Sequence, residues 1–79
     1  MTDATLPSAA QIRAARALLG WSQTDLAARA GVSRRTLTSI ESGDERVSPE
    51  SIEALQAVLE GAGLEFTGSG TDEGVRRKD

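Results

Sequence analysis

Two adjacent arginines, Arg34 and Arg35, directly follow Ser33, a residue type that favours the position just before a helix. A guanidinium group donates two parallel hydrogen bonds, which match the O6 and N7 atoms of guanine or the oxygens of a phosphate. One such pair with guanine discriminates against other bases by ~1–3 kcal/mol. The two arginines could therefore read a nucleic acid; the alternative is that both are solvated surface charges.

Other reactive side chains are scarce. The 79 residues include no histidine and no cysteine, which removes the commonest general acid–base group, the commonest metal ligand and any disulfide. No pair of acidic residues clusters beside an apolar segment that could form a pocket. We therefore expect neither an enzyme, nor a cofactor, nor a metal site.

The N-terminal residues and the hydropathy pattern indicate the cellular location of the protein. The N-terminus lacks the basic and then apolar segments that are typical of a signal peptide. No apolar run approaches the ~20 residues that a membrane helix needs. We expect a cytoplasmic protein of one compact domain, without a membrane partner.

Charge is distributed unevenly along the chain. The formal net charge of −3 argues against a non-specific binder of polyanions. Residues 8–47, however, contain six arginines and four acidic residues, whereas residues 48–67 contain four glutamates and no basic residue. A positive first part and a negative second part would orient the molecule toward a polyanion despite its acidic total.

Cap residues and glycines divide the chain into four expected helices. Ser8 with Gln11 forms a capping-box pattern, and Ser48 followed by proline is a strong start signal. Leucine, isoleucine, valine and alanine then recur at helical spacing, and a glycine follows each segment. The expected helices are residues 9–19, 23–30, 34–42 and 49–60.

The segment after the fourth expected helix has a different pattern. Residues 64–67 alternate apolar and polar side chains, which predicts a short strand. Residues 75–78 fit either a return strand or a basic tail, and the sequence leaves both open. A strand with an open edge could also pair with the same strand of a second copy.

The connection between the second and third expected helices is unusually short. Only Gly31, Val32 and Ser33 separate them. A turn this tight that begins with glycine forces two short helices to cross at a steep angle, which is helix-turn-helix geometry. In such a pair the second helix protrudes and fits the width of the DNA major groove.

The residues of these two helices resemble a known family. Residues 22–43 follow the pattern SQxxLAxxAGVSxxTLxxIExG, and Trp21 precedes it. This pattern is similar to the lambda-repressor/Cro-like (xenobiotic-response-element type) helix-turn-helix family, and the resemblance covers residues 12–59. It implies an all-α bundle of four helices, here with a short C-terminal β strand or hairpin as an open addition.

The resemblance also implies roles for individual residues. Gln23 matches a position that contacts a phosphate and reaches an outer base pair. The first exposed positions of the recognition helix correspond to Arg34 and Arg35, and the base-reading position one turn later to Ser39. The remaining matches are Thr38 as a weaker base contact, and Ser42, Gly43 and Arg46 as contacts to the sugar-phosphate backbone.

Two charged positions match a structural feature of the family. Arg16 and Glu41 occupy positions that resemble a buried ion pair between the first and third helices, so we expect them to orient helices rather than bind DNA. Trp21 is expected to anchor the core between the first two helices.

The sequence as a whole predicts a flexible N-terminus over residues 1–7, a helix-turn-helix DNA-binding domain over residues 8–67 and a flexible loop and basic tail over residues 68–79. We expect a sequence-specific transcriptional regulator that binds double-stranded DNA as a homodimer on a pseudo-palindromic site. The alternative is an antitoxin or an interaction partner of a larger regulator, which the acidic stretch over residues 50–65 favours.

Overall fold

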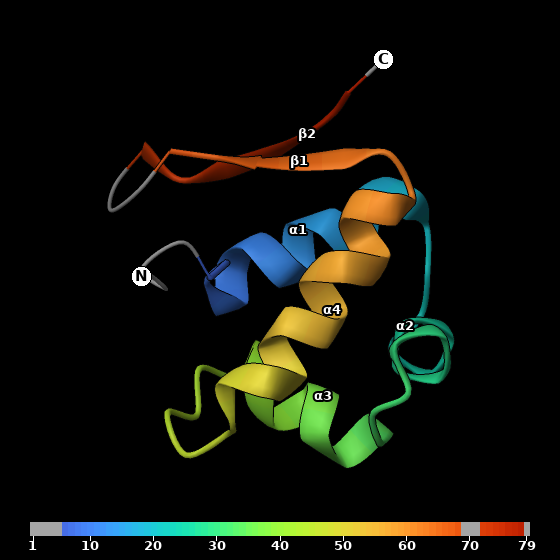
Figure 1. Ribbon diagram of the computed structural model, residues 1–79, viewed down its shortest axis with the longest axis vertical. Helices are drawn as coiled ribbons and strands as arrows, with labels where there is room; N and C mark the ends of the chain where they lie inside the picture. Colours follow the sequence, from blue (N-terminus) through green and yellow to red (C-terminus); the bar gives the residue numbers. More distant parts are fainter. Residues whose placement is uncertain (1–5, 69–71, 79) are drawn as a thin grey trace.

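The computed structural model describes residues 6–68 and 72–78 and contains four helices followed by an antiparallel hairpin (Figure 1). This is the predicted all-α bundle, and it resolves the open question of the C-terminus in favour of a hairpin. The elements are α1 (Ala9–Leu19), α2 (Gln23–Ala30), α3 (Arg34–Glu41), α4 (Pro49–Gly61), β1 (Leu64–Thr67) and β2 (Gly74–Arg77).

The predicted caps begin the first two helices. Ser8 and Gln11 form a reciprocal capping box at α1, and Ser22 and Asp25 form one at α2. The backbone amide of Ser22 donates to the Asp25 carboxylate and holds the pKa of that carboxyl below its usual value. Both helices end at a glycine in the left-handed conformation, and Gly31, with φ of 71°, makes the turn before α3 possible.

The third and fourth helices differ from expectation by one residue each. Helix α3 ends at Glu41, because Ser42 is the C-cap, and the Ser42 hydroxyl donates to the Ser39 carbonyl at 2.8 Å. Helix α4 includes Gly61 as its last residue and begins at Pro49 after the Ser48 N-cap. These are the small differences expected where helix ends fray.

The core joins apolar side chains from every helix to the first residue of β1. Leu64 is fully buried, which ties the hairpin to the helices rather than leaving it as an appendage. The buried apolar residues are Ile12, Ala15, Leu26, Ala27, Leu37, Ile40, Leu55, Leu59 and Leu64. Trp21, which we expected to anchor the core, is half-buried and packs against it, as does Val32 of the turn.

The hairpin pairs residues 64–67 with residues 77–74 in antiparallel register. Gln11, buried in α1, holds it by donating from Nε2 to the Gly74 carbonyl at 2.8 Å and to the Thr67 carbonyl at 3.2 Å. We expected the domain to end at residue 67, whereas β2 continues the folded structure to Arg77. Parts of the expected flexible segments, residues 1–5, 69–71 and 79, lie outside the described residues.

The hairpin and α3 lie at opposite ends of the molecule (Figure 1). Strand β2 packs against α1, and β1 packs against α4. Helices α1 and α4 therefore separate the sheet from α2 and α3. No helix in residues 6–68 and 72–78 has the length and apolar character needed to cross a membrane.

Candidate nucleic-acid interface

The turn between α2 and α3 sets the position of the candidate interface. The Val32 amide donates to the Ala27 carbonyl at 3.1 Å, which closes the end of α2. Ser33 then caps α3 by accepting from the Thr36 amide at 3.0 Å. Since Leu37 and Ile40 are buried, the opposite face of α3 must point outward.

The outward face of α3 carries every residue of this helix and its cap that the sequence assigned to DNA. At ~3.6 residues per turn these positions span about 140° of the helix circumference. All are exposed except Ser39, which is half-buried. They are Arg34, Arg35, Thr38, Ser39 and Ser42.

The two arginines at the start of this face have no acidic partner among the residues that the structure describes. Arg34 and Arg35 are exposed, and no ion pair within residues 6–68 and 72–78 includes either. Both guanidinium groups therefore keep their full set of donors for an external acceptor, such as a guanine edge or a phosphate.

Gln23 extends this surface from α2. It is the first residue of α2, where the leading amides of a helix have no partner within the helix. Its side chain reaches α3, where Oε1 accepts from the Thr38 hydroxyl at 3.4 Å. The structure thus brings Gln23 and Thr38, which are 15 residues apart in the chain, to one site.

Arg16 and Glu41 form the ion pair that the family resemblance implied. The Arg16 Nε atom donates to Glu41 Oε2 at 2.9 Å and its Nη2 atom donates to Oε1 at 3.1 Å. The Glu41 side chain is 5% exposed, so its charge is shielded from solvent. Arg16 also donates to the Trp21 carbonyl at 3.1 Å, which connects the pair to the start of α2.

Two contacts around Glu41 were not foreseen from the sequence. Gln23 Nε2 donates to Glu41 Oε1 at 3.0 Å, and the exposed Arg13 donates to the Glu41 backbone carbonyl. Neither has a local signal, because the partners are 18 and 28 residues apart. The buried carboxylate therefore touches a residue of the candidate interface.

In the loop after α3, Arg46 is paired with a neighbouring aspartate, which the sequence did not indicate. Its guanidinium donates from Nε and Nη2 to Asp44, each at 3.0 Å, although the arginine side chain is 90% exposed. These hydrogen bonds lower the pKa of Asp44 to about 2 and raise the pKa of Arg46. Arg46 keeps unused N–H donors, but the aspartate beside it offsets its charge.

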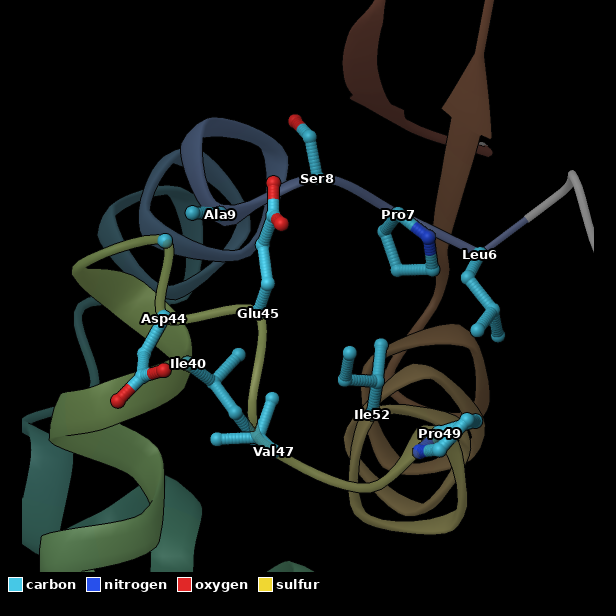
Figure 2. A pocket seen from close by; sticks show the side chains of 11 residues that line it. Leu6, Pro7, Ser8, Ala9, Ile40, Asp44, Glu45, Val47, Pro49 and Ile52 are labelled. Carbon is cyan, nitrogen blue, oxygen red and sulfur yellow. The ribbon is translucent and has the colours of Figure 1, made fainter.

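A pocket of about 360 Å³ lies beside the same loop (Figure 2). Its apolar walls come from Pro7 before α1, Ile40 at the end of α3, Val47 of the loop itself and Ile52 near the start of α4. In Figure 2 the Asp44 carboxylate points away from these walls. Apolar side chains thus support the loop on this side, and the Asp44 carboxylate lies on the other.

Trp21, which precedes α2, and Arg29, in the last turn of α2, contact each other. The Arg29 guanidinium carbon lies 4.2 Å from the centre of the Trp21 ring, a cation–π contact. Because the ring is half-buried and covered by this arginine, Trp21 serves the packing of α2 rather than a stacking contact with a base.

The sequence of residues 12–65 matches the model of the helix-turn-helix family of the Cro/C1 type. The chain belongs to the Cro/C1-type helix-turn-helix family. The match covers all of α1 except its first turn, and it continues through α4 into β1. No curated protein matches the chain closely enough to count as a relative.

Membership in the Cro/C1-type family makes this chain a DNA-binding protein of transcription regulation, and the family is not one of enzymes. In this helix-turn-helix protein the exposed face of α3 and the start of α2 correspond to the expected DNA-binding surface. Within the described residues, no three His, Cys, Asp or Glu side chains are grouped so that they could hold a metal ion.

Proposed function

We propose that this protein is a sequence-specific regulator of transcription that binds DNA as a homodimer, with α3 in the major groove. The observation that carries the proposal is the division of α3 into two faces. Leu37, Ile40 and Glu41 are buried against the other helices. The opposite face offers polar side chains and two exposed guanidinium groups that form no ion pair within the described residues.

Each candidate residue has a role that follows from its chemistry. Arg34 and Arg35 read guanine or bind phosphate, and Thr38 and Ser39 contact base edges one turn later. Gln23, Ser42 and Arg46 bind the sugar-phosphate backbone and set the position of α3 in the groove. A protein that binds DNA must be in the same compartment as the DNA, and we propose that this compartment is the cytoplasm.

In vitro selection of bound DNA sequences, followed by affinity measurements on the selected site, tests this function. We expect Arg34→Ala with Arg35→Ala to weaken specific binding by about 100-fold, since each bidentate pair contributes ~1–3 kcal/mol. Circular dichroism should show an unchanged fold, because both side chains are exposed.

A matched control removes two positive charges from the hairpin end of the molecule. Arg76→Ala with Lys78→Ala changes the net charge by the same amount as the double variant in α3, and both residues are exposed. We expect this variant to stay within about threefold of the unmodified protein. Full affinity in the α3 variant, or an equal loss in the control, would contradict the assignment of α3.

A dimer is proposed because one recognition helix reads only a few base pairs, so two half-sites about one helical turn apart are needed. The free edge of β2 supports it. The Lys78 amide donates to the Gly63 carbonyl at 2.8 Å. Since hydrogen-bonded pairs alternate along an antiparallel ladder, the backbone groups of Val75 and Arg77 then point to the open edge.

Pairing of β2 with β2 of a second copy is compatible with binding one duplex. Antiparallel strands pair about a two-fold axis normal to the sheet, so both copies keep their helices on the same side of it. Because α3 lies at the end opposite the hairpin, both α3 helices would then face the same way (Figure 1).

The side chains around the outer edges of the two hairpin strands favour β2 over β1 as the edge that pairs in the dimer. Strand β1 packs against α4, on which Glu53 and Glu60 are exposed, and a two-fold axis there would bring like charges together. Strand β2 packs against α1, whose exposed face carries no acidic residue, and on β2 itself the charge of Arg76 is offset by Glu65 of β1.

Sedimentation of two matched variants tests the β2 interface. Arg77→Pro removes an amide at the open edge, and Arg77→Ala loses the same side chain, which donates to the Leu18 carbonyl, but keeps that amide. We expect dimers at tens of micromolar for the unmodified protein and for Arg77→Ala, and monomers for Arg77→Pro. A monomeric unmodified protein would contradict the proposed dimer.

A second candidate function is binding of a protein, as an antitoxin or as the partner of a larger regulator. The observation that favours it is the exposure of Glu50, Glu53 and Glu60 along α4, which suits a basic partner surface. A pull-down with the product of the neighbouring gene, repeated with the three glutamates changed to glutamine, distinguishes this function from DNA binding. DNA affinity should not fall in that variant.

A further inference from the structure

Gln23 of the candidate interface contacts a buried negative charge. Its Nε2 atom lies 3.0 Å from Glu41 Oε1, in a carboxylate that also accepts two hydrogen bonds from Arg16. The Glu41 side chain is 5% exposed. A buried carboxylate with this partner is a strong and fixed acceptor, because charge-assisted hydrogen bonds are shorter and stronger than neutral ones.

This contact determines which way the Gln23 amide faces. A carboxylate accepts hydrogen bonds and donates none, so only the NH₂ end of the amide can approach it. The other end then lies toward Thr38, whose hydroxyl donates to Gln23 Oε1 at 3.4 Å. The reversed amide would place two acceptors against each other at Glu41.

One hydrogen of Nε2 is left over. An amide NH₂ group carries two hydrogens, and among the described residues Nε2 has Glu41 as its acceptor. The remaining hydrogen belongs to the first residue of α2, where the leading backbone amides also have no partner within the helix. Together these groups form a donor site that suits a phosphate oxygen.

We infer that Glu41 is a positioning residue for DNA binding, which holds the Gln23 amide with its free N–H available to a phosphate. The inference rests on the proposed function, because the phosphate contact of Gln23 is part of it. It adds a role for Glu41 besides the orientation of α1 and α3. Glu41 itself touches no DNA in this role.

Nuclear magnetic resonance of the free protein tests the first half of the inference without DNA. We expect the side-chain NH₂ group of Gln23 to be rigid on the ps–ns timescale. The matched comparison is Gln56, which donates to Glu60 at 3.2 Å on the exposed face of α4. A Gln23 amide as mobile as that of Gln56 would overturn the inference, even if Glu41 variants fail to fold.

The second half is tested on a selected DNA site with single phosphates replaced by neutral methylphosphonates. At the phosphate that Gln23 contacts, the replacement should weaken the unmodified protein about tenfold, the effect expected for one hydrogen bond to a charged group. Gln23→Ala should reduce that penalty to within about twofold.

Two variants of the ion pair separate positioning from stability. In Glu41→Gln the new side chain can turn either end of its amide toward Gln23, so the Gln23 amide is free to rotate. The loss of affinity caused by the methylphosphonate should then fall to less than about threefold. Arg16→Met breaks the same ion pair but leaves Glu41 as the acceptor for Gln23, so the tenfold penalty should remain.

The outcomes distinguish this inference from the function on which it rests. An unmodified protein that binds no DNA would refute the proposed function and this role together. A protein in which Gln23→Ala abolishes the penalty but Glu41→Gln leaves it at tenfold would retain the proposed function. Glu41 would then have no positioning role.

Discussion

Arg16 and Glu41 join the last turns of α1 and α3 through two parallel hydrogen bonds, 2.9 Å from Nε to Oε2 and 3.1 Å from Nη2 to Oε1. The arginine side chain is 24% exposed and the glutamate 5% exposed. The two residues are 25 positions apart in the chain, and their contact joins α3 to α1.

Removal of one partner of this pair should destabilise the protein strongly. Arg16→Met leaves the Glu41 carboxylate buried and uncompensated, and we expect the free energy of unfolding to fall by about 3 kcal/mol. The double variant Arg16→Met with Glu41→Leu should recover most of that loss, because no buried charge remains. Urea denaturation measures both, and a single variant within about 0.5 kcal/mol of the unmodified protein would contradict the prediction.

Loss of the Gln11 side chain should loosen the hairpin. Gln11 is 7% exposed, and its amide donates to two strand carbonyls and accepts from the Ser8 amide at 2.8 Å. Gln11→Ala leaves these groups without partners, so we expect a loss of about 2 kcal/mol in the free energy of unfolding and faster hydrogen exchange in β1 and β2. The half-buried Gln56, whose amide bonds only the Glu60 side chain, supplies the control Gln56→Ala. Equal losses in the two variants would refute this role.

The Asp44 carboxyl should titrate far below its usual range. Hydrogen bonds from Arg46 lower its pKa from 3.8 to about 2, so the contact stabilises the folded state above about pH 4. This contribution is lost as the pH falls from about 4 toward 2, because the folded protein must then protonate a carboxylate that the unfolded chain has already protonated. A carbon-detected titration should give a midpoint near 2. In Arg46→Ala the midpoint should rise toward 3.8 but stay below it, because the backbone amide of residue 46 still donates to the Asp44 carboxylate.

Neutralising Asp44 should strengthen DNA binding. Asp44 accepts both guanidinium hydrogen bonds of Arg46 beside the proposed backbone contact and carries a negative charge there. Asp44→Asn should raise affinity several-fold at low salt and make its dependence on salt steeper by about one phosphate contact. The matched control is Asp72→Asn, a neutralised exposed aspartate at the hairpin end of the molecule. Weaker binding by Asp44→Asn would show that the Asp44–Arg46 contact assists DNA binding.

The local features of this fold follow from the sequence alone. Ser8, Ser22, Ser33 and Ser48 begin the helices at the predicted positions, and Gly31 ends α2. A cap joins atoms within about four residues of each other, so the residue types at that spacing determine it. The pattern over residues 22–43 likewise predicted the family that the comparison then showed.

Other features depend on residues that are far apart in the chain. From the sequence, the C-terminal segment fitted either a hairpin or one strand followed by a tail. The sequence indicated Gln11 only as part of a helix cap, but its side chain binds both strands and so helps to hold them as a hairpin. Hydrogen bonds of this kind depend on the relative placement of whole elements. No spacing within the sequence specifies that placement.

The interface shows the same division. The helical period predicted that α3 buries one face, because side-chain direction in a helix repeats every ~3.6 residues. The family resemblance of the sequence implied that Arg34, Arg35 and Thr38 lie on its exposed face, where the structure has them. Only the tertiary structure placed Gln23 against Thr38 and Glu41. These contacts require that α2 and α3 cross, and that Arg16 of α1 pairs with the buried Glu41 carboxylate.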